Sequence, residues 1–141
     1  MRLISLNAAV VVSLLALGSS ASAQEAFQIK GTWKGDGIAV ISGNNPYREA
    51  EGQGPSFPPN IIEFTYEIVQ QEGNRFSGKS TGGDHVESLI GAINPDNQRA
   101  IMLDDDGQYD LTIVDANTIN ACYHHLKPNS RAVGCYQLKK Q

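Results

Sequence analysis

Four side chains in the second half of the chain have the chemistry to hold a small molecule or to move a proton on it. They are Glu87, Tyr109, Tyr123 and His125. A carboxyl group and an imidazole can act as acid and base on a bound substrate, and burial would raise the pKa of Glu87. The same groups can instead orient a ligand without reacting with it. Either role requires a fold that gathers these distant positions.

The elements that gather them are predicted to be β-strands. Apolar and polar residues alternate, and turn-forming residues interrupt the alternation every ~8–12 positions, which is typical of an antiparallel sandwich or barrel. Eight strands are expected, at 27–41, 61–71, 75–81, 86–93, 98–104, 108–114, 118–126 and 131–139. Successive hairpins and an even strand number favour an all-β, up-and-down antiparallel barrel, because closure removes exposed sheet edges.

The two cysteines support the last hairpin. A turn at residues 127–130 places Cys122 opposite Cys135, at a separation that a disulfide can bridge. The preceding turn, at 115–117, pairs Tyr109 with Tyr123. Turns at Asp106-Gly107 and at 94–97 would pair Met102 both with Leu111 and with Leu89, and Gly91 with Ala100.

These registers assign an interior face. From the later strands it collects Leu89, Gly91, Met102, Leu111, Ile113, Ile119, Ala121, Tyr123, Tyr136 and Leu138. From the earlier strands it collects Phe27, Ile29, Trp33, Ile62, Phe64, Tyr66, Ile68 and Phe76. Keeping both Ile68 and Phe76 inside requires an odd-length turn or a bulge near Gly73.

Four apolar residues are turned outward by the same register: Val86, Ile90, Ile101 and Leu103. Two explanations are open. The chain self-associates as a homo-oligomer through this patch, or the register of that hairpin slips by one residue, which would invert a whole strand.

The two ends of the barrel differ in character. One end has tight turns and apolar interior residues, so it is expected to be plugged. The other receives a long loop at about 42–60, which carries Tyr47, Arg48 and Phe57. Glu87, Tyr109, Tyr123 and His125 converge there. A pocket that is apolar below and polar at its rim suits a small, partly apolar molecule, with Tyr66 in the wall and Trp33 at the floor.

Two motifs raise the question of a metal. His124 and His125 are adjacent in a strand and so point to opposite faces, although His125 could join His85 and Glu87 in a ligand set. The run Asp104-Asp105-Asp106-Gly107 resembles a fragment of a calcium loop but lacks the remaining ligands, so a solvated hairpin turn is expected. No metal is predicted.

Residues 1–23 have the pattern of a secretory signal peptide. Arg2 precedes an apolar stretch too short to span a bilayer, and Ala21-Ser22-Ala23 supplies the cleavage site. Cleavage near Ala23 would leave a single domain at 24–141 in the periplasm or outside the cell, where a disulfide persists. The net charge of −4 argues against a nucleic-acid partner, and no membrane span is expected in the mature chain.

Gly31-Thr32-Trp33 resembles the Gly-x-Trp motif in the first strand of the calycins, the lipocalin and avidin superfamily. That family packs an Arg of its last strand over the Trp, and this chain has Lys139 or Lys140 instead. The resemblance implies a barrel that binds a small molecule. The longer pattern at residues 31–37 is also similar to the opening of the haem-binding nitrobindins, for whose haem histidine His125 is the only late, inward-facing candidate. No cofactor is predicted, and haem is kept only as an alternative.

The sequence is therefore compatible with three functions. The first is a small-molecule-binding barrel in which Trp33, Tyr66, Glu87, Tyr109, Tyr123 and His125 form the site. The second is a cyclase- or isomerase-type enzyme on the same barrel, with Glu87 or His125 as acid/base. The third is a protein-interaction or inhibitor module acting through loop 42–60.

Overall fold

A computed structural model describes residues 25–47 and 54–141 as an all-β protein. The described chain forms β1 (Gly31–Gly37), β2 (Val40–Gly43), β3 (Ile62–Glu72), β4 (Arg75–Gly82), β5 (His85–Ile93), β6 (Arg99–Leu103), β7 (Gln108–Asp115), β8 (Thr118–Lys127) and β9 (Ser130–Lys140). The described ranges include no helix with the length and hydropathy of a membrane span. The signal-peptide prediction at 1–23 lies outside the described residues.

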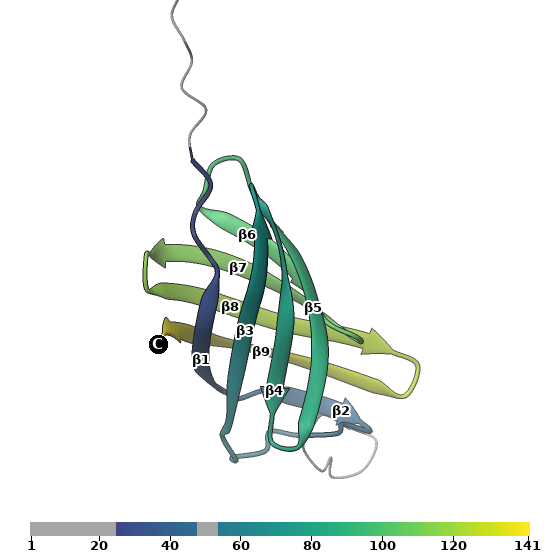
Figure 1. Ribbon diagram of the computed structural model, residues 1–141. Helices are drawn as coiled ribbons and strands as arrows, with labels where there is room; N and C mark the ends of the chain where they lie inside the picture. The colour runs from purple at the N-terminus through teal and green to yellow at the C-terminus, as the bar shows by residue number, and fades with distance from the viewer. Residues whose placement is uncertain (1–24, 48–53) are drawn as a thin grey trace, which may run out of the picture.

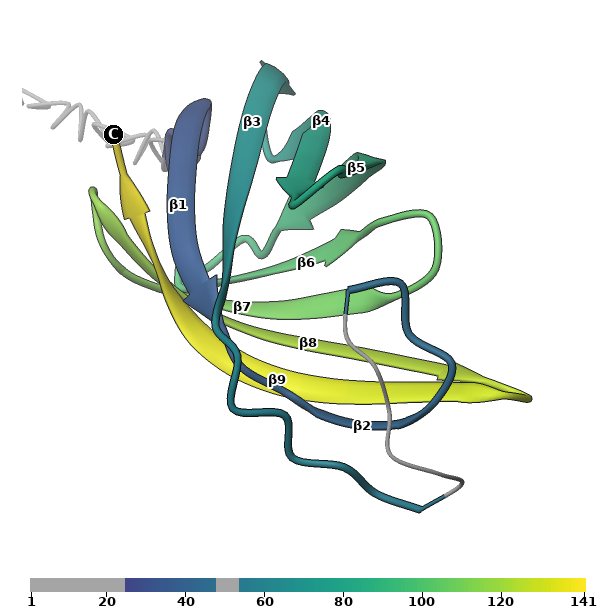
Figure 2. The same cartoon turned by 90° about the horizontal axis from the view of Figure 1, so that it is seen from below.

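Eight of these strands form a closed antiparallel up-and-down barrel, as predicted. Sequential strands from β3 to β9 are neighbours, and β1 closes the barrel by pairing with both β3 and β9. Strands β1, β3, β4 and β5 run across β6–β9 at a steep angle (Figure 1). β2 continues from β1 and lies along β9 at one end of the barrel (Figure 2).

The prediction of one strand at 27–41 was wrong at its start and in its middle. Residues 25–30 are not in a strand, and the chain enters β1 at Gly31, whose φ of 131° suits glycine. The strand then breaks at Ile38 and Ala39, and β2 pairs with β9 and, through Ile41, with Ser56. Gly134 permits this break, because a Cβ there would lie 2.3 Å from the Ile38 carbonyl oxygen.

The residues before β1 close one end of the barrel. The Gln71 side chain donates to the Phe27 carbonyl (2.7 Å) and accepts from the Ile29 amide (3.0 Å), while the Phe27 amide donates to Asn97 Oδ1 (3.0 Å). Ile29 is buried and Phe27 packs on the core. This end also holds the buried residues Ile68, Ile93, Ile119 and Leu138, so the predicted apolar plug is confirmed.

Faces were predicted correctly even where two registers were not. β8 and β9 pair Cys122 with Cys135, and β7 and β8 pair Tyr109 with Tyr123, as expected. Met102, however, lies opposite Gly91 and Tyr109 instead of Leu89 and Leu111. Each register differs from the predicted one by two residues, because the turns centre on 96–97 and on 105–106. A shift of two residues leaves each side chain on its predicted face of the sheet.

Ile68 and Phe76 are both buried, as expected, and the irregularity that permits this lies between Ile68 and Gln70. The extra residue, Val69, is exposed on the outside. The bulge was predicted near Gly73, at the turn, and instead occurs within β3. Gly78 pairs with Ile68 beside it, where a Cβ would lie 2.1 Å from the Glu67 carbonyl oxygen.

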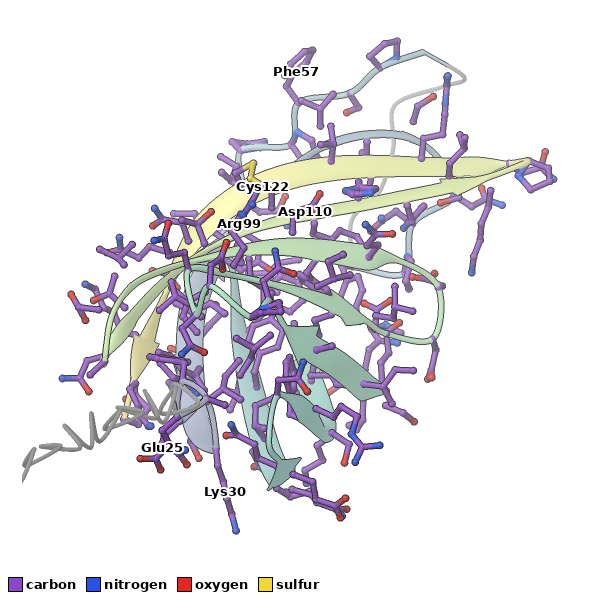
Figure 3. The ribbon with its side chains drawn as sticks, turned by 90° about the horizontal axis from the view of Figure 1, so that it is seen from above. Glu25, Lys30, Phe57, Arg99, Asp110 and Cys122 are labelled. Atoms are coloured by element: carbon purple, nitrogen blue, oxygen red, sulfur yellow. A yellow bond between two sulfur atoms is a disulfide. The ribbon has the colours of Figure 1, made fainter. Side chains whose placement is uncertain are left out.

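The outer face carries the disulfide and the apolar patch. Cys122 and Cys135 are bonded between β8 and β9, and Figure 3 shows the bond beside the labelled Cys122. The predicted outward side chains are exposed, namely Val86, Ile90, Ile101 and Leu103. Ile90 lies opposite Leu103, so the two strands present one apolar surface and a one-residue slip is excluded.

Candidate functional site

The open end of the barrel is where the sequence placed the site. The connections after β4, β6 and β8 reach this end, together with the segment that follows β2. A small cavity of about 40 Å³ lies here. It is lined by Gly37, Ile38, Ala39, Ile41, Asn45, Tyr47, Phe64, Glu87, Asp104, Tyr109, Tyr123, Ala132, Gly134 and Tyr136. Among the residues that the structure describes, no Lys, Arg or His lines it.

Five aromatic rings from separate segments form much of the cavity wall. Tyr47 packs edge-on against Phe64, with ring centroids 5.4 Å apart, and Phe64 stacks on Tyr136 at 5.9 Å. Tyr109 and Tyr123, paired across β7 and β8, have ring centroids 4.8 Å apart. The wall is therefore built by side chains from β3, β7, β8 and β9 and by a residue that follows β2.

Each carboxylate at the mouth accepts a hydrogen bond from a tyrosine. Tyr47 donates to Glu87 (2.9 Å) and Tyr109 donates to Asp104 (3.1 Å). Tyr123 donates to Asp106 (2.7 Å), which also accepts from Lys127 Nζ (2.9 Å) on the outer side. The phenol protons are thus directed at carboxylates.

The turn between β6 and β7 brings two acidic side chains inward. Asp104 Oδ1 accepts from the amides of Asp106 and Gly107, which fixes the turn and leaves Asp104 Oδ2 for Tyr109. Gly107 makes room for the Tyr123 ring, since a Cβ there would lie 2.3 Å from it. Asp104 and Asp106 are half-buried, so the prediction of a solvated turn was wrong for these two side chains.

Three carboxylates face one another across the mouth. Glu87, Asp104 and Asp106 each offer an oxygen, and these oxygens all lie within 4.8 Å of one another. Burial raises the pKa of Glu87, the Tyr47 hydrogen bond opposes this, and the three neighbouring Asp charges add to the rise. Burial would also raise the pKa of Asp106, but hydrogen bonds from Lys127 and Tyr123 hold it below its ordinary value.

The tyrosines are held neutral by the same arrangement. Burial is the largest cause of the raised pKa values of Tyr47, Tyr109 and Tyr123, and nearby carboxylates raise them further. Neutral phenols can donate to a carboxylate but cannot act as phenolate bases near neutral pH. Their chemical contribution here is therefore to orient groups and to wall the cavity.

His125 is buried behind this wall. Its Nδ1 lies 2.9 Å from the Tyr123 hydroxyl, and its Nε2 lies 2.8 Å from Ser130 Oγ. Because Tyr123 donates to Asp106, the bonding pattern assigns a proton to His125 Nδ1. Both ring nitrogens are used within the fold, and the bonds of Glu87 go elsewhere, to Tyr47.

Trp33 and Tyr66 lie deeper, in the core between the cavity and the closed end. Trp33 Nε1 donates to the Ile29 carbonyl (2.7 Å), and Lys140 Nζ lies 5.2 Å from the centroid of its ring. Tyr66 bonds through its hydroxyl to that of Tyr136, which does line the cavity. Glu87, Tyr109 and Tyr123 are thus brought together at the cavity. His125 does not line the cavity but contacts Tyr123, which does, and Trp33 lies deeper in the core.

The ligand set of His85, Glu87 and His125, which the sequence left open without favouring it, does not assemble. His85 is exposed and its Nε2 contacts the Pro46 carbonyl (3.1 Å), and His124 lies on the outer face near Asp110. Haem does not fit these residues either. Both nitrogens of His125 are bonded, and a macrocycle needs several times the volume of this cavity (roughly 300 Å³ or more).

Five contributors to the site were not among the predicted site residues: Tyr47, Phe64, Asp104, Asp106 and Tyr136. Phe64 and Tyr136 were expected only on the interior face. Tyr47 follows β2 in a loop whose path no periodicity specifies, and Arg48 of the same loop lies outside the described residues. Phe57, farther along it, points away from the barrel (Figure 3). The signal for the aspartates was present, since three consecutive acids in a turn at the open end place alternate side chains over the mouth.

No protein-family model, curated protein or solved structure matches this chain.

Proposed function

We propose that this protein is an exported, calycin-like barrel that binds a small, partly apolar molecule at its mouth. The observation that carries the proposal is the cavity between Tyr47, Phe64, Tyr109, Tyr123 and Tyr136. Concave, mostly apolar sites with a few convergent polar groups are the usual form of small-molecule sites, and barrel mouths are a common place for them.

The asymmetry between the two ends supports binding at this mouth. The closed end is packed with aliphatic residues and bonded to the chain before β1. The open end instead holds half-buried carboxylates and neutral phenols around an unfilled space. Burying such groups costs free energy, and a site for a ligand is a physical reason for retaining them.

Calycin membership has support from the partner of Trp33. The family packs a cation of the last strand over the indole, and Lys140 of β9 lies over the Trp33 ring here. A cation near an aromatic ring adds about 0.5–1 kcal/mol at a partly exposed site. Lys140 also donates to the Gln28 carbonyl (3.1 Å), which ties the end of the last strand to the plug.

Binding has more support than acid/base catalysis. A catalytic pair must reach the substrate, whereas His125 uses Nδ1 on Tyr123 and Nε2 on Ser130. Glu87 lines the cavity but is bonded to Tyr47. The arrangement thus fixes these groups in place as walls and anchors.

The binding proposal is tested by thermal unfolding with a panel of small uncharged, cationic and anionic organic compounds. A ligand at about 100 times its Kd adds about 2.7 kcal/mol to the free energy of unfolding, which raises Tm by several degrees. Ala132→Leu fills the cavity and should abolish the rise, while Ala116→Leu, exposed in the turn between β7 and β8, should keep it. If no compound raises Tm, the proposal is rejected.

Export is tested on the same protein. Expressed with residues 1–23 in a bacterium, the chain should be recovered from the periplasm with the mass of residues 24–141. It should lack two hydrogens because Cys122 and Cys135 are bonded. A mass that includes residues 1–23, or recovery from the cytoplasm alone, would contradict export.

A further inference from the structure

The cavity selects for charge as well as size. Its wall combines five aromatic rings with Glu87 and Asp104, and Asp106 lies directly behind. Aromatic rings attract organic cations through their negative π faces, and an acid at the edge adds a Coulombic term. The aromatic cavity and the carboxylates are separate features that favour the same ligand charge.

Anions are disfavoured by the direction of the phenol protons. Tyr47 gives its proton to Glu87, and Tyr109 gives its proton to Asp104. At these two pairs an anionic ligand would therefore meet carboxylate and phenol oxygens instead of donors. Lys127 bonds Asp106 from outside and is not part of the lining.

The volume limits the size of the group that enters. About 40 Å³ corresponds to room for about three water molecules, if each needs roughly 10–15 Å³ of such space. A methylated ammonium group is of this size, whereas a fatty acid or a polycyclic ring is much larger. The rest of a longer ligand would extend outward past Tyr47.

We propose that the mouth cavity binds a small organic ammonium group, with its methyl or methylene groups against the rings and its charge beside Glu87 and Asp104. This rests on the proposed function and names the class of ligand. The ligand would place a positive charge beside Glu87 and Asp104, whose hydrogen-bond donors among the described residues are phenols and backbone amides. Asp106 is already served by Lys127 and lies 3.7 Å from His125 Nδ1.

The test compares choline with its uncharged carbon isostere, 3,3-dimethylbutan-1-ol, by isothermal titration calorimetry at low salt. The two have nearly the same shape, so the ratio of their affinities isolates the charge. Choline should bind at least tenfold more tightly. Glu87→Gln should reduce that ratio several-fold without loss of folding. Asp84→Asn, the same charge change in the exposed turn after β4, should leave the ratio unchanged.

The other possible results distinguish failure of the ammonium proposal from failure of the binding function. Equal binding of choline and the isostere would overturn the ammonium proposal and leave the binding function intact, as would binding of only anionic or neutral members of the earlier panel. A Glu87-dependent rise of Tm with calcium chloride, without any response to choline, would make this a metal site and overturn the proposal. No binding by any panel member would reject the function itself.

Discussion

Glu87 and Asp106 stand within one carboxylate cluster but differ in their partners. Glu87 has a single phenol donor, and three aspartate charges lie near it. Asp106 has a phenol and an ammonium group. Ionisation of Glu87 therefore opposes folding, whereas ionisation of Asp106 favours it. The two residues should respond to substitution with opposite signs and in different pH ranges.

Glu87→Gln is expected to stabilise the protein near neutral pH. The pKa of Glu87 is raised above its ordinary value near 4.5, so the folded state binds the proton more tightly than the unfolded chain does. Wild-type stability relative to the variant is thus lost as pH rises from 4.5 through the raised pKa. We expect a gain of no more than about 1 kcal/mol at pH 7, since solvent screens this half-exposed group.

Urea unfolding of both proteins at pH 4 and pH 7 measures this gain. The difference in the free energy of unfolding should be larger at pH 7, because at pH 4 Glu87 is mostly protonated in both states. Asp84→Asn, exposed in the turn after β4, serves as the control for a general reduction of negative charge. A loss of stability at pH 7 would show that the Glu87 charge supports the fold.

Asp106→Asn is expected to destabilise the protein at pH 7 by about 1–2 kcal/mol, because it removes the charged bond to Lys127 and weakens that to Tyr123. The pKa of Asp106 is lowered in the folded state, so its contribution is present above 3.8 and is lost as pH falls through the lowered pKa. The difference between wild type and variant should therefore shrink at pH 3. The exposed neighbour substitution Asp105→Asn should have little effect at either pH.

Hairpins are the elements on which the sequence is most informative. Alternation alone specified which side chains face inward, because the period of a strand is two residues. It did not specify the turns around β6, where both registers differ by two residues from those expected. The Asp104 side chain accounts for one of them, since it bonds the amides of Asp106 and Gly107 and so moves the turn centre toward β6.

The site was less predictable than the sheet. Tyr109 and Tyr123 could be placed from register, and Glu87 from its face, because all three lie in regular strands. Tyr47 could not, since its position depends on ring contacts with Phe64 and His85 that follow no period. Sequence reasoning also missed that neutral tyrosines and turn aspartates would pair, which requires knowing the turn geometry.

The β8–β9 hairpin should depend on its disulfide. Replacing both Cys122 and Cys135 with Ser should lower the free energy of unfolding by about 3 kcal/mol, because the bond closes a loop with a sequence separation of 13 residues. Denaturant unfolding of wild type with and without dithiothreitol provides the comparison. The reductant should destabilise the wild type by a similar amount and leave the double variant unchanged; equal stability of all forms would contradict this role.

At the scale of the whole molecule, the described residues leave an apolar face of the closed barrel exposed. Val86 and Ile90 of β5 and Ile101 and Leu103 of β6 are 40–62% exposed on two paired strands. Such contiguous apolar surfaces are characteristic of interfaces. Because the patch lies on the outer wall of the barrel, its occupation and ligand binding at the mouth should be independent.

Self-association through this face is the expected consequence. In sedimentation velocity runs, the average mass of the wild type should rise from that of a monomer toward that of a dimer as concentration increases, because a two-fold pair buries the same patch on both copies. Ile101→Lys should keep the protein monomeric, since it places a charge in the centre of the contact. Val133→Lys, a comparably exposed apolar position on β9, should leave association intact. A wild type that stays monomeric throughout would leave the patch without this role, whereas equal loss in both variants would place the contact elsewhere.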